Sequence, residues 1–169
     1  MNKTALVLID FQNVRTDEKS PYYVGDISDI IAKVNYLKDY AQKMGYKTIF
    51  TRHLESNGDF SQHEQNSEII TEISKNENDI IVKKNKINPF YKTDMDEQLK
   101  GIENVVVCGI LTNLCVRSFV EGAYDREMNI VILKDCCKAF DKKSHEFTLE
   151  DLKKTREEID ILDLQGFLE

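Results

Sequence analysis

Short, nearly continuous runs of apolar residues recur along the chain, at residues 5–9, 48–51, 80–82, 105–108 and 130–133, with a shorter run at 159–162. Runs of this length are typical of parallel strands that are buried on both faces of a sheet. We therefore predict a strand at each of these six positions.

Helical patterns separate the predicted strands. In the first, apolar residues at helical spacing extend from an Asp26 N-cap to Gly45, just past the end of the helix. The other helices are expected at 68–74, at 93–101 with a capping box from Thr93 to Asp96, from 112 or 113, and from about 144. Because strands and helices alternate throughout, we predict one domain over residues 1–169. Its expected fold is three-layer α/β/α, with a mostly parallel, doubly wound, Rossmann-like sheet of about six strands.

The bulk properties exclude several classes of function. The formal net charge of −7 argues against a nucleic-acid partner, because binding phosphates requires a concentrated basic surface. No apolar run approaches the length needed to span a membrane, and the N-terminus lacks the pattern of a signal peptide. The four cysteines, with Cys136 and Cys137 adjacent, are expected to be reduced thiols in the cytoplasm. A nucleotide- or flavin-binding module is disfavoured, because no glycine-rich phosphate motif follows any predicted strand.

Three chemically reactive residue types follow predicted strands, where ligands of parallel sheets usually bind. Asp10 follows the first run and Lys84 the third, and Cys115 lies at the start of the helix after the fourth. Backbone N–H groups at a helix start favour a thiolate and an oxyanion. A base, a cation and a nucleophile would thus meet at one edge of the sheet. For each residue alone the ordinary alternative stays open: a loop aspartate, a solvated lysine, a buried cysteine.

At these residues the sequence resembles the isochorismatase-like cysteine hydrolases, which include nicotinamidases, N-carbamoylsarcosine amidase and ureidoacrylate-type amidohydrolases. The resemblance covers nearly the whole chain. It rests on residues 8–12, on Lys84 with Asn88-Pro89-Phe90, Thr93 and Leu99, on residues 109–116, and on Asp135-Cys136-Cys137 followed by His145.

The resemblance implies a catalytic triad of Asp10, Lys84 and Cys115. It also implies a cis peptide between Ile110 and Leu111, with the backbone N–H groups of Leu111 and Cys115 forming an oxyanion hole. The implied activity is hydrolysis of a C–N bond in a small amide, ureido or carbamoyl substrate through a Cys115 thioester. By the same analogy the protein is expected to be a homo-oligomer, a dimer or tetramer. The residues implied to line the substrate pocket, with core packing as the alternative, are Phe11, Phe90, Ile110 and Leu114.

The sequence also departs from the family pattern. Nicotinamidases usually carry an Asp-x-His pair after the second strand, where this chain has His53 and Glu55, with His63 further on. We expect no cofactor; a divalent metal held by these three side chains is the alternative. Isochorismatases that cleave a vinyl ether commonly lack the cysteine, so Cys115 favours C–N cleavage. A vinyl-ether hydrolase and a catalytically silent binding or assembly subunit remain the alternative functions.

Overall fold

The computed structural model describes residues 3–169, over which strands and helices alternate. The strands are β1 (Thr4–Ile9), β2 (Lys47–His53), β3 (Ile80–Lys84), β4 (Asn104–Ile110), β5 (Asn129–Lys138) and β6 (Asp160–Leu162). The α-helices are α1 (Ser28–Lys43), α2 (Met95–Gln98), α3 (Arg117–Tyr124), α4 (Lys142–Thr155) and α5 (Leu164–Leu168). Shorter turns are the 3-10 turns η1 (Asn13–Arg15) and η2 (Gln65–Ser67) and the π-helical turn η3 (Thr112–Val116). Each of the six predicted strands is present.

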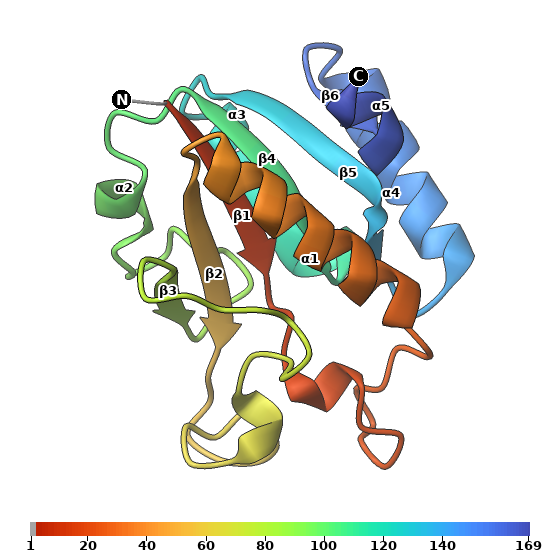
Figure 1. Ribbon diagram of the computed structural model, residues 1–169. Helices are drawn as coiled ribbons and strands as arrows, with labels where there is room; N and C mark the ends of the chain where they lie inside the picture. The colour runs from red at the N-terminus through yellow and green to blue at the C-terminus, as the bar shows by residue number, and fades with distance from the viewer. Residues whose placement is uncertain (1–2) are drawn as a thin grey trace.

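All six strands run parallel in one sheet, in the order β3-β2-β1-β4-β5-β6 (Figure 1). The chain builds one half of the sheet outward from β1 to β3, and then returns to the centre at β4 and builds the other half. The direction of winding therefore changes between β1 and β4. In such sheets the crevice beyond the carboxyl ends of these two strands is the usual ligand position. The predicted doubly wound α/β fold is confirmed.

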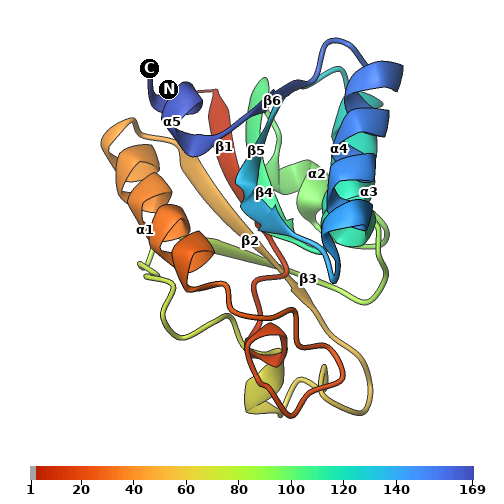
Figure 2. The same cartoon turned by 90° about the vertical axis from the view of Figure 1, so that its right-hand side faces the viewer.

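Helices cover both faces of the sheet. Figure 2 shows α1 and α5 on one face and α3 and α4 on the other. The first helix ends as predicted before Gly45, whose φ is +70°. Its N-cap position is Ile27, one residue later than predicted, and the Asp26 carboxylate accepts a hydrogen bond from the Ser28 N–H. Within residues 3–169, no helix combines the length and apolar character needed to cross a bilayer.

The prediction of a helix at 68–74 is wrong. Ile69 instead forms an antiparallel bridge with Gln12, and the Ile70 N–H donates to the Phe11 carbonyl. Ile69, Ile70 and Ile73 are all buried. The three isoleucines match a helical spacing, but backbone hydrogen bonds to the loop after β1 hold Ile69 and Ile70 in a bridge, and a turn follows.

The helix predicted at 93–101 is also shorter in the structure, where α2 spans only Met95–Gln98. The Thr93 hydroxyl accepts a hydrogen bond from the Met95 N–H, two residues along the chain, so the predicted capping box with Asp96 does not form. Gly101 then turns the chain toward β4 with a φ of +79°.

Candidate active site

Asp10 lies directly after β1, at the point where the winding of the sheet reverses. Its side chain has no exposed surface, and its φ of +49° lies in the left-handed region that non-glycine residues seldom adopt. The register pairs Leu8 with Phe50, which brings Thr51 beside Asp10. The Thr51 hydroxyl donates to Asp10 Oδ1 at 2.5 Å and accepts from the Asp10 N–H at 3.1 Å. This pair of hydrogen bonds holds both the backbone and the carboxylate of Asp10.

Lys84, the last residue of β3, brings its amine to the same place. Its Nζ is 2.7 Å from Asp10 Oδ2 and 3.4 Å from Cys115 Sγ. It also donates to the Lys86 carbonyl at 3.2 Å. The side chain of Lys84, like that of Asp10, is fully buried. One buried ammonium therefore neutralises the carboxylate and contacts the sulfur, in surroundings where charge interactions are stronger than in water.

Cys115 lies in η3, the π-helical turn that follows β4. The peptide between Ile110 and Leu111 is cis, as the resemblance implied. Gly109, just before it, has a φ of +154°, and a Cβ at this position would lie 2.4 Å from the Ile9 carbonyl oxygen. Only glycine lets the end of β4 approach the end of β1 this closely. The turn that carries the sulfur is thereby held against the strand that carries the carboxylate.

The Cys115 thiol is protonated at neutral pH. Burial raises its pKa to about 12, and the neighbouring Asp10 charge acts in the same direction, whereas the Lys84 ammonium lowers the pKa. The sequence-based expectation of a stabilised thiolate is therefore not met in the free protein, because burial and a carboxylate outweigh the ammonium. Cys115 is a buried residue, with 8% of its surface exposed. A nucleophilic role requires a base to accept the thiol proton.

His53, at the end of β2, borders this cluster. Its Nδ1 is 3.4 Å from Lys84 Nζ, and its Nε2 is 3.1 Å from Glu55 Oε1. Among residues 3–169, no three His, Cys, Asp or Glu side chains gather closely enough to hold a metal ion. The alternative metal site of His53, Glu55 and His63 is therefore not assembled, although its first two members are in contact.

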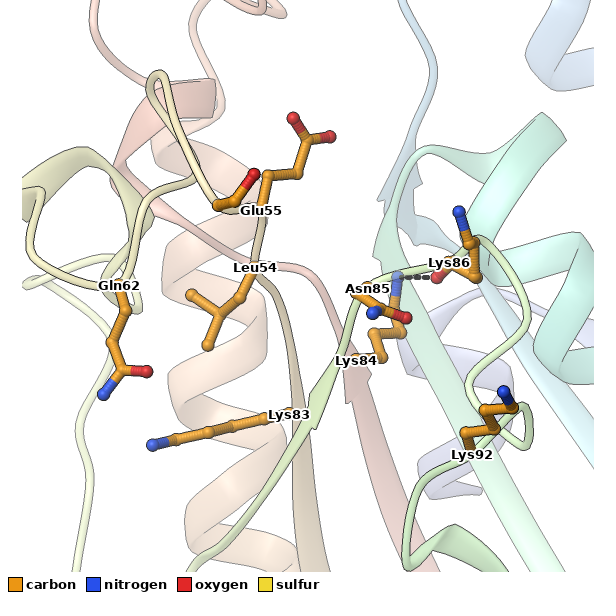
Figure 3. A pocket seen from close by; sticks show the side chains of 9 residues that line it. Leu54, Glu55, Gln62, Lys83, Lys84, Asn85, Lys86 and Lys92 are labelled. Atoms are coloured by element: carbon orange, nitrogen blue, oxygen red, sulfur yellow. Dashed lines mark hydrogen bonds between the residues drawn. The ribbon is translucent and has the colours of Figure 1, made fainter.

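A cavity of about 710 Å³ opens beside Lys84, at the edge of the sheet (Figure 3). Lys84, Lys86 and Lys92 point to one side of the β3 segment, and Lys83 points to the other. Asp10 and Cys115 do not line this cavity, so it adjoins the cluster only through Lys84. Its lining is mostly polar and comprises residues 54–56, Gln62, residues 83–86 and Lys92.

The four residues implied to line a substrate pocket have different surroundings. Phe11 and Ile110 have no exposed surface and belong to the core, which is the alternative that the sequence left open. Phe90 stacks on Phe119, with ring centroids 5.4 Å apart. Leu114 is 41% exposed. None of the four lines the cavity beside Lys84.

Two residues near the cluster were not among the candidates from the sequence. Thr51 could have been found from the sequence, because it is the only hydroxyl residue near the carboxyl end of β2, which pairs with β1. Arg15 follows Asp10 in the same loop, and the residue is 6% exposed. A lone arginine there gives no signal of burial in the sequence, since most arginines are solvated.

The model of the isochorismatase domain matches residues 4–160. This chain therefore belongs to the isochorismatase family, and the resemblance noted from its motifs is confirmed. The crystal structure of an isochorismatase-like hydrolase from Alkaliphilus metalliredigens is similar, with a TM-score of 0.88 and 25% identity. That match covers 98% of this chain and 96% of that chain.

Two curated relatives match over most of their length. Nicotinamidase 3 of Arabidopsis thaliana is 28% identical over 165 residues, which cover 88% of this chain and 79% of that protein. Ureidoacrylate amidohydrolase RutB of Agrobacterium fabrum is 26% identical over 171 residues, which cover 79% of this chain and 75% of that protein. The chain spans less than half the length of two other family proteins, YecD of Escherichia coli O157:H7 (38%) and YwoC of Bacillus subtilis (45%).

Proposed function

We propose that this protein hydrolyses the C–N bond of a small amide, ureido or carbamoyl compound through a covalent intermediate on Cys115. The observation that carries the proposal is the position of Lys84 Nζ, 2.7 Å from Asp10 Oδ2 and 3.4 Å from Cys115 Sγ. The nicotinamidase and ureidoacrylate amidohydrolase relatives support a substrate of this class. The proposed reaction needs no metal or cofactor.

In the first step, Asp10 accepts the thiol proton as the Cys115 sulfur attacks the carbonyl carbon of the substrate. A C–S bond forms, and the electron pair of the carbonyl π bond moves to the oxygen. The backbone N–H groups of Leu111 and Cys115 donate to this oxyanion. The Lys84 ammonium stabilises the negative charge on the sulfur while the proton moves to the carboxylate.

In the second step, the tetrahedral intermediate collapses and the C–N bond breaks. Asp10 returns its proton to the leaving nitrogen, which departs as ammonia or an amine and leaves a thioester on Cys115. Water then attacks the thioester and gives a proton to Asp10. The C–S bond breaks, Asp10 passes that proton to the sulfur, and the acid product is released.

The contact between Lys84 and Cys115 favours this reaction over the alternatives. A vinyl-ether hydrolase needs no sulfur at this position, and a silent binding or assembly subunit needs none of the three side chains. We further propose a cytoplasmic homo-oligomer. The four free cysteines support the cytoplasmic location. Sedimentation of the purified protein would test the oligomeric state.

The test is turnover of primary amides, ureido acids and nicotinamide, each with and without an added divalent metal ion. We expect the native protein to release ammonia or an amine from at least one of them, and Cys115→Ala to release none. Mass spectrometry of the quenched native reaction should find an acyl group on Cys115. Cys136→Ala, which removes a buried thiol elsewhere, is the control. Activity retained by Cys115→Ala would reject covalent catalysis.

A further inference from the structure

Arg15 lies in η1, shortly after Asp10, and its backbone is held from both sides. Its N–H donates to the Gln12 carbonyl at 2.9 Å, and its carbonyl accepts from the Val24 N–H at 3.1 Å. The Gln12 side chain in turn donates to the carbonyls of His53 and Ser67. These hydrogen bonds fix the Arg15 segment to the end of β2, next to the candidate active site.

Two of the three guanidinium nitrogens of Arg15 are buried without a hydrogen-bond partner among residues 3–169. The residue is 6% exposed, and the two nitrogens are Nε and Nη1. Buried charges in proteins are normally paired and hydrogen-bonded, because an unpaired charge loses its hydration without compensation. The described residues supply no acceptor for these donors, so they are available to a bound group.

Three aromatic rings surround this guanidinium. The ring centroids of Tyr22, Phe60 and Phe140 lie 5.8, 5.4 and 6.0 Å from Arg15 Cζ. These cation–π contacts are attractive and offset part of the desolvation. Aromatic rings provide no lone pairs in the guanidinium plane, so the N–H donors remain available to an anion.

Phe60 connects Arg15 to the catalytic candidates. Its ring centroid lies 5.2 Å from that of His53, whose Nδ1 is 3.4 Å from Lys84 Nζ. Burial lowers the pKa of Arg15, and the charges of Asp10 and Cys115 oppose that shift. The Arg15 loop therefore adjoins the candidate active site through Phe60 and His53.

We propose that Arg15 binds a carboxylate group of the substrate. This inference rests on the proposed function and narrows its substrate class to small amide or ureido acids. A guanidinium presents parallel N–H donors that match the two oxygens of a carboxylate. Because Arg15 is buried, the resulting ion pair is stronger than it would be in water. A neutral amide such as nicotinamide would leave the guanidinium unpaired.

The test compares the alkylation of Cys115 by iodoacetate and by iodoacetamide, two reagents of similar size of which only the first is an anion. In both reactions a C–S bond forms and iodide leaves. Peptide mass spectrometry gives the rate at Cys115 for each reagent. We expect Arg15→Gln to lower the iodoacetate-to-iodoacetamide rate ratio roughly tenfold or more, as expected for loss of a charge-assisted hydrogen bond. Arg15→Lys, which keeps the charge, should give an intermediate ratio.

Arg156→Gln is the matched control. It removes the same charge and also a cation–π contact, since Arg156 Cζ is 5.5 Å from the Tyr124 ring. Arg156 follows α4, at the end of the sheet opposite to the candidate site. We expect its rate ratio to equal that of the native protein. Thermal unfolding of every variant establishes that it is folded.

An effect of Arg15→Gln that is equal for both reagents, or absent, would overturn the inference, because a purely structural arginine does not discriminate reagent charge. Failure of Cys115 to react with either reagent would overturn the inference together with the proposed function. Amide hydrolysis without Arg15-dependent selectivity would overturn the inference and leave the proposed function standing. Arg15-dependent selectivity without hydrolysis of any amide would support the anion site and reject the proposed function.

Discussion

Replacing Thr51 by valine tests whether its hydroxyl positions Asp10. Valine has the same branching and nearly the same volume, but it removes both hydrogen bonds to Asp10, at 2.5 and 3.1 Å. A hydrogen bond to a charged group contributes about 1.5 to 3 kcal/mol, and an unsatisfied buried N–H costs about 1 to 3 kcal/mol. Since the added methyl group recovers part of this loss, we expect the free energy of unfolding to fall by about 3 kcal/mol.

Urea denaturation followed by circular dichroism measures this change. A loss of that size should lower Tm by roughly 6 to 12 °C in a protein of this length. We also expect kcat/KM for any amide substrate to fall roughly 100-fold, because the carboxylate is no longer held in place. Thr48→Val on the same strand is the control, because the Thr48 hydroxyl has no side-chain hydrogen bond within residues 3–169.

The result that would refute this reasoning is a Thr51→Val protein that loses no more stability than Thr48→Val and retains its kcat/KM. In that case the two hydrogen bonds would contribute nothing to the position of Asp10. A loss of stability without a loss of activity would assign Thr51 to the fold alone.

Three other perturbations have defined outcomes. Lys84→Met leaves the buried Asp10 carboxylate unpaired and should lower the free energy of unfolding, measured by urea denaturation, by about 3 to 5 kcal/mol. Adding Asp10→Asn should recover part of that loss. A double variant that recovers none of it would contradict the pairing of Lys84 with Asp10. Gly109→Ala places a Cβ 2.4 Å from the Ile9 carbonyl oxygen and should lower both Tm and the alkylation rate of Cys115. Gly58→Ala is the control: a Cβ at Gly58 meets no atom within 4 Å, so this variant should change only Tm. Burial raises the pKa of the Cys108 thiol well above its ordinary value. Because the unfolded chain ionises near pH ~8.5, stability is retained below that pH and falls above it, by roughly 1 kcal/mol per pH unit. The urea midpoint between pH 8 and 10 measures this loss. Cys108→Val should make the pH dependence shallower by the contribution of one thiol, because burial also raises the pKa of the Cys115, Cys136 and Cys137 thiols.

Much of the fold follows from local sequence. The inner strands β1, β2 and β4 could be predicted because strands buried on both faces need continuous apolar runs. The edge strands β3 and β6 are only partly buried, and their apolar runs are correspondingly short. The first helix could also be predicted, because its apolar residues recur at helical spacing and Gly45 marks its end. The segment at 68–74 could not, because its isoleucines suit a helix equally well and only hydrogen bonds to the distant loop after β1 decide against one.

The site divides in the same way. The sequence alone determined that Asp10, Lys84 and Cys115 lie at or just after the carboxyl ends of strands. Parallel strands bring these ends to one edge of the sheet, so the meeting of the three residues was predictable. Only the tertiary structure decided their distances, the partner of Asp10 on β2 and the protonated state of the sulfur, because these depend on register and burial. It also decided that Arg15 is enclosed by rings from three separate loops. Burial of a charge depends on which segments surround it, and a sequence read locally does not contain that information.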